Sequence, residues 1–167
     1  MEYITSIKDT IYPASLSYKK RNAVRGIILT NNNEIVLMHI NTQDIFGKRD
    51  HYELPGGGIK QNEDGISALK REIKEETGFI IDNISEVGII DIQYNPLNRI
   101  DIQHYYKAQV IDKVLPSLTN YEKDVFENIV FVPIENITNF YNTFKTEGVG
   151  KLIHTRDLIA IKKALNI

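Results

Sequence analysis

The feature that most constrains the fold is the segment REIKEETGF, in which three glutamates end a predicted helix. Helical periodicity runs over residues 64–77, and Gly78 suits the left-handed position that commonly follows a helix. The carboxyl end of a helix already carries partial negative charge, and Glu72 and Glu76, four residues apart, repel each other. The segment therefore needs a positive charge from elsewhere.

The same helix has an apolar stripe, which places the glutamates at the edge of a core. Ile66, Leu69 and Ile73 follow the i, i+3, i+7 spacing of one buried face. At about 100° per residue the three glutamates fall on the neighbouring flank. Asn62 or Asp64 is expected to cap the start of the helix. Hard divalent cations take oxygen ligands, so this flank can hold magnesium.

A solvated flank is the alternative interpretation, with Arg71 paired to Glu75 and the remaining charges exposed. The stretch LPGGGIK, just upstream, favours a binding site. Pro55 stiffens the entry to this loop, and its glycines permit close backbone approach. Such a loop beside carboxylates can offer carbonyl oxygens to a metal and amides to phosphate oxygens.

The spacing of these residues matches the pattern G-x5-E-x7-R-E-U-x-E-E-x-G-U, in which U is a bulky apolar residue. The matching positions are Gly57, Glu63, Arg71, Glu72, Ile73, Glu75, Glu76, Gly78 and Phe79. In this motif the chain resembles the Nudix (MutT-like) hydrolase family, and the strand order looks similar from about residue 22 to residue 140. The resemblance implies the Nudix fold, a mixed central β-sheet sandwiched between helices.

The periodicity of the whole chain predicts the same mixed α/β (α+β) class, because strands outnumber helices. Residues 1–20 read as an N-terminal extension with a short strand ended by Pro13, and residues 21–167 as one Nudix domain. Strands are expected at 23–30, 34–40, 52–54, 79–95, 100–111 and 129–134, a loop at 41–51, and a terminal helix at 155–167 capped by Thr155.

The family resemblance also implies the chemistry. Members hydrolyse a nucleoside diphosphate linked to another moiety and use magnesium or manganese. Glu72, Glu75 and Glu76 correspond to the metal-binding and catalytic carboxylates, and the Gly56 carbonyl to a backbone ligand. Arg71 corresponds to the residue that orients the glutamates. The supporting loop would comprise Gly57, Gly58 and Glu63.

A further carboxylate is expected from a later loop. Glu127 lies just before the 129–134 strand, where family members often place an acidic ligand or general base. Glu122 is the second candidate. An ordinary solvated acid is the alternative for both residues.

Substrate contacts are expected from arginines and aromatic residues. Arg25 and Arg49 can meet phosphates, and Tyr52, Tyr94 and Tyr105 can offer a face to a nucleobase. Further candidates are Phe46, Lys48 and His104. The alternative for each is packing in the core or a solvated position on the surface.

Composition limits the kinds of partner and chemistry that are expected. The 167 residues carry a net charge of −2, so no global basic field recruits a nucleic-acid polymer. No cysteine is present, which excludes disulfides, thiolate ligands and the cysteine chemistry expected of isopentenyl-diphosphate isomerase. With no signal-like or membrane-spanning run, we expect a cytoplasmic protein that binds a small nucleotide substrate and can form a homodimer. A non-catalytic Nudix module that senses a nucleotide is the alternative function.

Overall fold

The computed structural model describes residues 1–167. The strands are β1 (Tyr3–Ile7), β2 (Lys19–Leu29), β3 (Glu34–Asp44), β4 (Gly47–Glu53), β5 (Phe79–Tyr94), β6 (Arg99–Lys113) and β7 (Phe126–Pro133). The α-helices are α1 (Gly65–Thr77), α2 (Asn120–Val125), α3 (Ile137–Thr143) and α4 (Val149–Leu165), and short 3-10 turns are η1 (Asn95–Leu97) and η2 (Ile134–Asn136).

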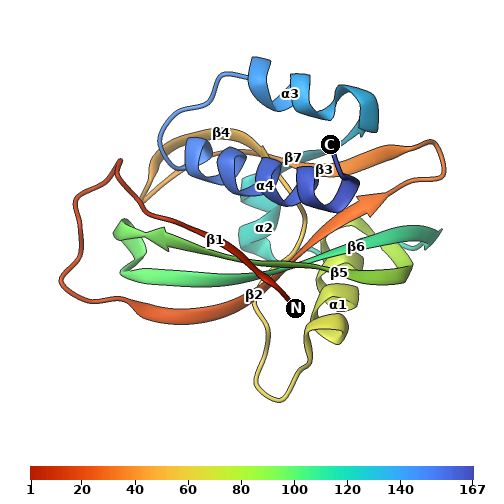
Figure 1. Cartoon of the computed structure of the whole chain (residues 1–167), viewed down its shortest axis with the longest axis horizontal. Coiled ribbons are helices and arrows are strands. Elements are labelled where there is room, and N and C mark those ends of the chain that lie inside the picture. Colours follow the sequence, from red (N-terminus) through yellow and green to blue (C-terminus); the bar gives the residue numbers. More distant parts are fainter.

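The strands form one mixed sheet in the order β1-β5-β6-β2-β3-β4, with β7 also paired to β3. The β1–β5 and β2–β6 pairs are parallel, and the others are antiparallel. Helix α1 covers one face, and α3 and α4 cover the other (Figure 1). The prediction of a mixed sheet between helices is therefore confirmed.

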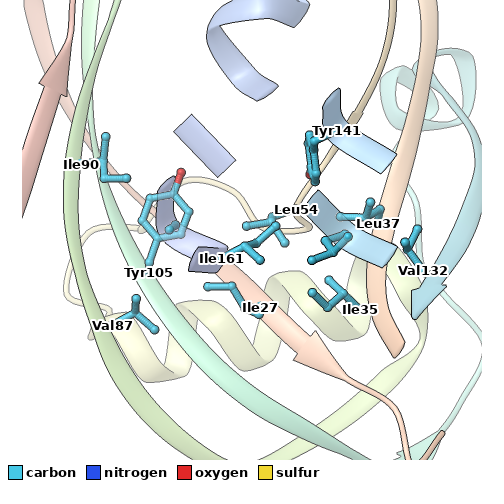
Figure 2. Packing of buried hydrophobic residues seen from close by; sticks show 12 residues of the cluster. Ile27, Ile35, Leu37, Leu54, Val87, Ile90, Tyr105, Val132, Tyr141 and Ile161 are labelled. Carbon is cyan, nitrogen blue, oxygen red and sulfur yellow. The ribbon is translucent and has the colours of Figure 1, made fainter. Parts of the chain in front are cut away.

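Side chains of the central strands point alternately to the two faces of the sheet, so each face has its own hydrophobic core. Ile27 belongs to the cluster under α3 and α4, whereas its neighbour Ile28 belongs to the cluster under α1. Tyr105 and Tyr106 divide between the two clusters in the same way. Figure 2 shows the first cluster, in which Ile27 and Tyr105 lie near Ile161 of α4.

The predicted helix at 64–77 is confirmed, but one position of its stripe is wrong. Leu69 and Ile73 are fully buried, whereas Ile66 is 43% exposed and Ala68 takes part in the core instead. Ile66 lies in the first turn of α1, and Ile73 and Leu69 lie in the later turns that carry the buried stripe. No helix of this chain combines the length and apolar character needed to cross a membrane.

Two further boundaries differ from the prediction. Residues 41–51 are not a loop, because β3 continues to Asp44 and pairs with β4 through a tight turn at Ile45 and Phe46. Their polar sequence reflects a hairpin whose far end has little core to cover. The last helix begins at Val149 instead of Thr155, whose hydroxyl donates to the Lys151 carbonyl inside α4.

The N-terminal residues join the sheet and support its neighbours. Strand β1 pairs in parallel with β5 and ends at Ile7, well before Pro13. Beyond it, the Tyr12 hydroxyl donates to the Phe46 carbonyl and accepts from the Val149 amide. This segment thus ties the β3–β4 turn to the start of α4.

Candidate active site

Both ends of α1 are fixed by local hydrogen bonds. The Asp64 side chain caps the helix by accepting from the Ile66 and Ser67 amides, each at 3.0 Å. At the other end Gly78 adopts φ 75° and donates its amide hydrogen to the Lys74 carbonyl. Because the buried stripe also fixes the rotation of the helix, the glutamate flank faces the glycine-rich loop.

Arg71 lies at the centre of a dense network of carboxylates. Its guanidinium donates to both oxygens of Glu63 at 2.8 Å, to Glu72 at 2.6 Å and to Glu75 at 3.1 Å. It also donates to the Gly58 carbonyl at 3.0 Å, which ties the helix to the loop. The hydrogen bonds from Arg71 lower the pKa of the Glu63 carboxyl to about 2. The network therefore fixes the orientation of three glutamates.

The loop glycines allow the backbone to approach the glutamates closely. The Gly56 amide donates to Glu76 at 2.8 Å, and Gly56 adopts φ 140°, where a Cβ would collide with the Val24 carbonyl. A Cβ on Gly57 would lie 2.6 Å from the Glu72 carboxylate. A larger residue would push the loop away from β2 at position 56 and away from the Glu72 carboxylate of α1 at position 57.

The Glu76 carboxyl is buried, and its neighbours only partly compensate the charge of its ionised form. Burial raises its pKa well above the ordinary value, Arg25 and the Gly56 amide oppose that rise, and the charges of Glu53 and Glu72 add to it. The electrostatic strain expected from the sequence at this end of α1 is thus present, and a cation would relieve it.

A third carboxylate completes the cluster. Oxygens of Glu72, Glu76 and Glu122 lie within 4.8 Å of one another. Three carboxylates suit a hard divalent cation such as magnesium or manganese, which takes oxygen ligands and retains water for a phosphate substrate. The residues present therefore fit the metal that the family resemblance implies.

Glu122 is presented by the cap of α2. One of its carboxylate oxygens accepts from the Thr119 amide at 2.7 Å and from the Thr119 hydroxyl at 2.8 Å. Both bonds use the same oxygen, which leaves the other free for a ligand. The sequence TNYE carries this capping-box signal, which could have predicted α2 and favoured Glu122.

The other two predicted carboxylates lie outside this cluster. Glu75 pairs with Arg71, and its side chain is 39% exposed. Glu127 accepts a 2.6 Å hydrogen bond from Asn41 and lies 3.9 Å from His39. The structure therefore places Glu122 beside Glu72 and Glu76, and Glu127 beside Asn41 of β3.

The cluster opens into a cavity of about 680 Å³. Gly56 to Gly58, Glu72, Glu76 and Glu122 line part of it, and arginines, further acidic residues and apolar side chains line the remainder. Arg25, Arg49 and Tyr94, predicted as substrate contacts, all line the cavity, together with Phe46. Arg21, Arg99, Leu97, Tyr121, Val149 and Ile153 also line it.

Two predicted substrate contacts lie elsewhere. Tyr52 stacks on His39 with ring centroids 4.5 Å apart and packs against the aromatic residues of the α3 region. Tyr105 is fully buried, and its hydroxyl donates to Asp157 at 3.2 Å. Neither ring lines the cavity. Lys48 and His104 do not line it either.

A buried ionic network beneath the cavity was missed from the sequence. Arg156 is fully buried and donates to Asp157 at 2.8 Å and to the Tyr94 hydroxyl at 3.0 Å. Asp157 accepts from the Leu54 amide at 2.8 Å, so α4 holds the start of the glycine-rich loop. The only signal was the adjacent pair of opposite charges, Arg156 and Asp157, inside the helix.

Glu53 joins this network to the cavity. Burial alone would raise its pKa, but Arg25, His51 and Arg156 hold the pKa below its ordinary value. Arg25 lies 3.5 Å from Glu53 and donates to the Leu54 carbonyl at 2.9 Å. The floor of the cavity is therefore formed by paired charged side chains, and the Glu53 carboxylate stays ionised.

Comparison with known proteins agrees with this architecture. The family model described as "NUDIX domain" matches residues 19–150, and the chain belongs to the Nudix family. Among solved structures, a Nudix hydrolase from Nitrosomonas europaea superposes with a TM-score of 0.66 at 17% identity, covering 89% of this chain and 90% of that one. A MutT Nudix hydrolase from Burkholderia pseudomallei gives 0.63 at 16% identity, covering 87% and 98%.

Two curated relatives match over shorter stretches. An 8-oxo-dGTP diphosphatase of Buchnera aphidicola subsp. Acyrthosiphon pisum is 37% identical over 62 residues, which are 37% of this chain and 49% of that protein. An RNA pyrophosphohydrolase of Ruthia magnifica subsp. Calyptogena magnifica is 38% identical over 60 residues, 36% of this chain and 31% of that protein. The matched stretch thus spans half or less of each relative.

Proposed function

We propose that this protein is a divalent-metal-dependent pyrophosphohydrolase that cleaves a nucleoside diphosphate linked to another moiety. The observation that carries the proposal is the convergence of Glu72, Glu76 and Glu122 at the end of a cavity lined by arginines. Negative carboxylates beside positive side chains suit a substrate whose anionic oxygens are bridged to the protein by a cation.

The residues of the site have separate tasks in this reaction. Glu72, Glu76 and Glu122, with the Gly56 carbonyl, would hold the metal, and Arg71 keeps Glu72 in place through a 2.6 Å hydrogen bond. When bound, magnesium or manganese neutralises the diphosphate and lowers the pKa of a water molecule. Overall, hydrolysis would add one water across the phosphoanhydride: the water oxygen bonds to one phosphorus, the bridging oxygen leaves with the other phosphorus, and the two protons go to the products or to solvent.

The size and lining of the cavity support a small nucleotide as substrate. A volume of about 680 Å³ lies in the usual range for small-molecule sites. Phe46 and Tyr94 offer aromatic faces for a base, with ring centroids 5.9 Å apart in an edge-to-face arrangement. The names of the two curated relatives, a diphosphatase and a pyrophosphohydrolase, support the cleavage of phosphoanhydrides.

A magnesium-dependent phosphate-release screen tests the proposal. Its panel would contain dNTPs, ADP-ribose, NADH, diadenosine polyphosphates, nucleotide sugars and coenzyme A. We expect one class to be hydrolysed and Glu76→Gln to lower kcat by about 100-fold or more, because it removes charge from the metal site. If no substrate reacts but calorimetry detects tight nucleotide binding, the protein is a non-catalytic sensor.

A second set of variants tests the third carboxylate. Glu122→Gln is expected to lower kcat by about 10-fold or more, whereas Glu127→Gln should change it by less than about 3-fold. Asp124→Asn, an exposed acid on the same helix as Glu122, is the matched control. A larger loss from Glu127→Gln than from Glu122→Gln would contradict the assignment.

A further inference from the structure

The arginines that line the cavity are not equivalent. Arg25 is committed to the floor through its hydrogen bond to the Leu54 carbonyl. Arg49 donates to Asp44 at 2.9 Å and lies over the Phe46 ring at 5.7 Å from its centroid. Both guanidiniums therefore already have protein partners that fix them as parts of the wall.

Arg21 and Arg99 form a different arrangement around one aspartate. Strands β2 and β6 run in parallel with Arg21 opposite Asp101, and Asp101 is buried between the two arginines. Arg99 makes a close ion pair with Asp101, whereas the Arg21 guanidinium lies 3.7 Å from it. One carboxylate thus serves two guanidiniums, which leaves one positive charge in excess.

The side chain of Arg21 is 43% exposed, and that of Arg99 is 28% exposed. A single 3.7 Å ion pair leaves most donors of the Arg21 guanidinium available to a ligand. Asp101 nevertheless limits the movement of both side chains. Arg21 is therefore partly ordered before a ligand arrives, which reduces the entropy lost on binding.

The position of Arg21 places this charge beside the carboxylate cluster. A Cβ on Gly58 would lie 2.5 Å from the Arg21 guanidinium, so this group rests against the loop backbone. The preceding residue, Gly57, makes the equally close approach to Glu72. The Arg21 guanidinium and the Glu72 carboxylate thus lie against adjacent residues of the glycine-rich loop.

We propose that Arg21 and Arg99 form an anion subsite for a phosphate beyond the scissile diphosphate. A metal held by the glutamates would offset part of the charge of the scissile diphosphate, and a third phosphate would need a counter-charge of its own. Guanidinium groups match phosphate oxygens with two parallel hydrogen bonds. This inference rests on the proposed function and names its substrate class. The site would prefer nucleoside tri- or polyphosphates to substrates whose second moiety is an uncharged sugar.

Calorimetric titration of the magnesium-loaded protein with tripolyphosphate and with pyrophosphate tests the subsite without requiring turnover. We expect tripolyphosphate to bind at least about 10-fold more tightly, and Arg21→Gln to reduce that ratio to about 2 or less. Arg21→Lys, which keeps the charge but loses the planar fork, should give an intermediate ratio. Lys20→Gln is the control. It removes an equal charge from the exposed residue that precedes Arg21 in β2, and it should leave the ratio unchanged.

Equal effects of Arg21→Gln and Lys20→Gln would overturn the subsite, since they would show only a general loss of charge. A native ratio near one would overturn it as well. If magnesium-dependent nucleotide hydrolysis is then observed, the proposed function still stands. If Arg21→Gln alone removes the preference and no nucleotide is hydrolysed, the subsite stands and the hydrolase proposal fails.

Discussion

Replacing Glu76 by glutamine is expected to stabilise the metal-free protein. Glu76 is 5% exposed, and burial together with the charges of Glu53 and Glu72 raises its pKa. Glutamine keeps an oxygen that can accept the 2.8 Å hydrogen bond from the Gly56 amide, but removes the charge. We expect a gain on the order of 1–3 kcal/mol in the free energy of unfolding at neutral pH.

The stabilisation by Glu76→Gln should depend on pH, and the direction follows from the raised pKa of Glu76. A carboxyl whose folded-state pKa is raised binds its proton more tightly in the folded protein than in the unfolded one. The folded protein therefore loses stability as pH rises above the ordinary value of 4.5 toward the raised pKa. Glu76→Gln lacks this loss, so its stability advantage should grow with pH across that interval.

Magnesium should reduce the advantage of the variant. A cation at ten times its dissociation constant stabilises the folded state by about 1.4 kcal/mol. For a chain of this length that corresponds to a rise of about 3–6 °C in melting temperature. Glu76→Gln removes one of the three clustered carboxylates, so the rise should shrink to about 2 °C or less under the same conditions.

Thermal unfolding in EDTA and then in increasing magnesium measures both effects on one sample series. Asp124→Asn, which removes an exposed acid near the site, is the control for a general change in charge. The reasoning fails if metal-free Glu76→Gln melts below the native protein. It also fails if magnesium raises the melting temperatures of the native and variant proteins equally.

Two further predictions concern charged groups around the site. Arg71→Met should lower the free energy of unfolding by about 2–4 kcal/mol in urea titrations, because it leaves the half-buried carboxylates around Arg71 unpaired; a loss below about 1 kcal/mol would contradict this. Burial and His51 lower the pKa of His154 to about 4, so stability should fall by up to about 3 kcal/mol as pH drops from 6.5 to 4. His154→Gln, whose oxygen can still accept from the Tyr52 amide, should flatten that slope, and an unchanged slope would exclude His154 as its source.

Helix α1, its two ends and its glutamate flank could be predicted because the interactions that define them are local. Asp64 caps amides two and three residues ahead, and Gly78 closes the last turn onto Lys74. The spacing from Gly57 to Phe79 likewise fixed which residues share the glutamate flank. The error at Ile66 arose because periodicity shows which residues share a helix flank, but not which of them the rest of the fold covers.

The choice between the later acids depended on tertiary structure. Glu122 and Glu127 are close in sequence, but Glu122 lies in α2 and Glu127 lies at the start of β7 instead of just before the strand. The capping turn of α2 directs Glu122 into the cluster, whereas pairing of β7 with β3 carries Glu127 to Asn41. The capping-box signal was readable, but the direction in which α2 points was not.

The sequence by itself therefore determined the glutamate helix, its caps and the family to which the chain belongs, because residues within one turn or one loop of each other define them. Only the tertiary structure decided which arginine remains available, since Arg21 meets Asp101 through the register of two strands far apart in the chain. It likewise decided that Arg156 and Tyr94 form one buried contact. Burial and charge pairing across elements follow from packing, which no local spacing encodes.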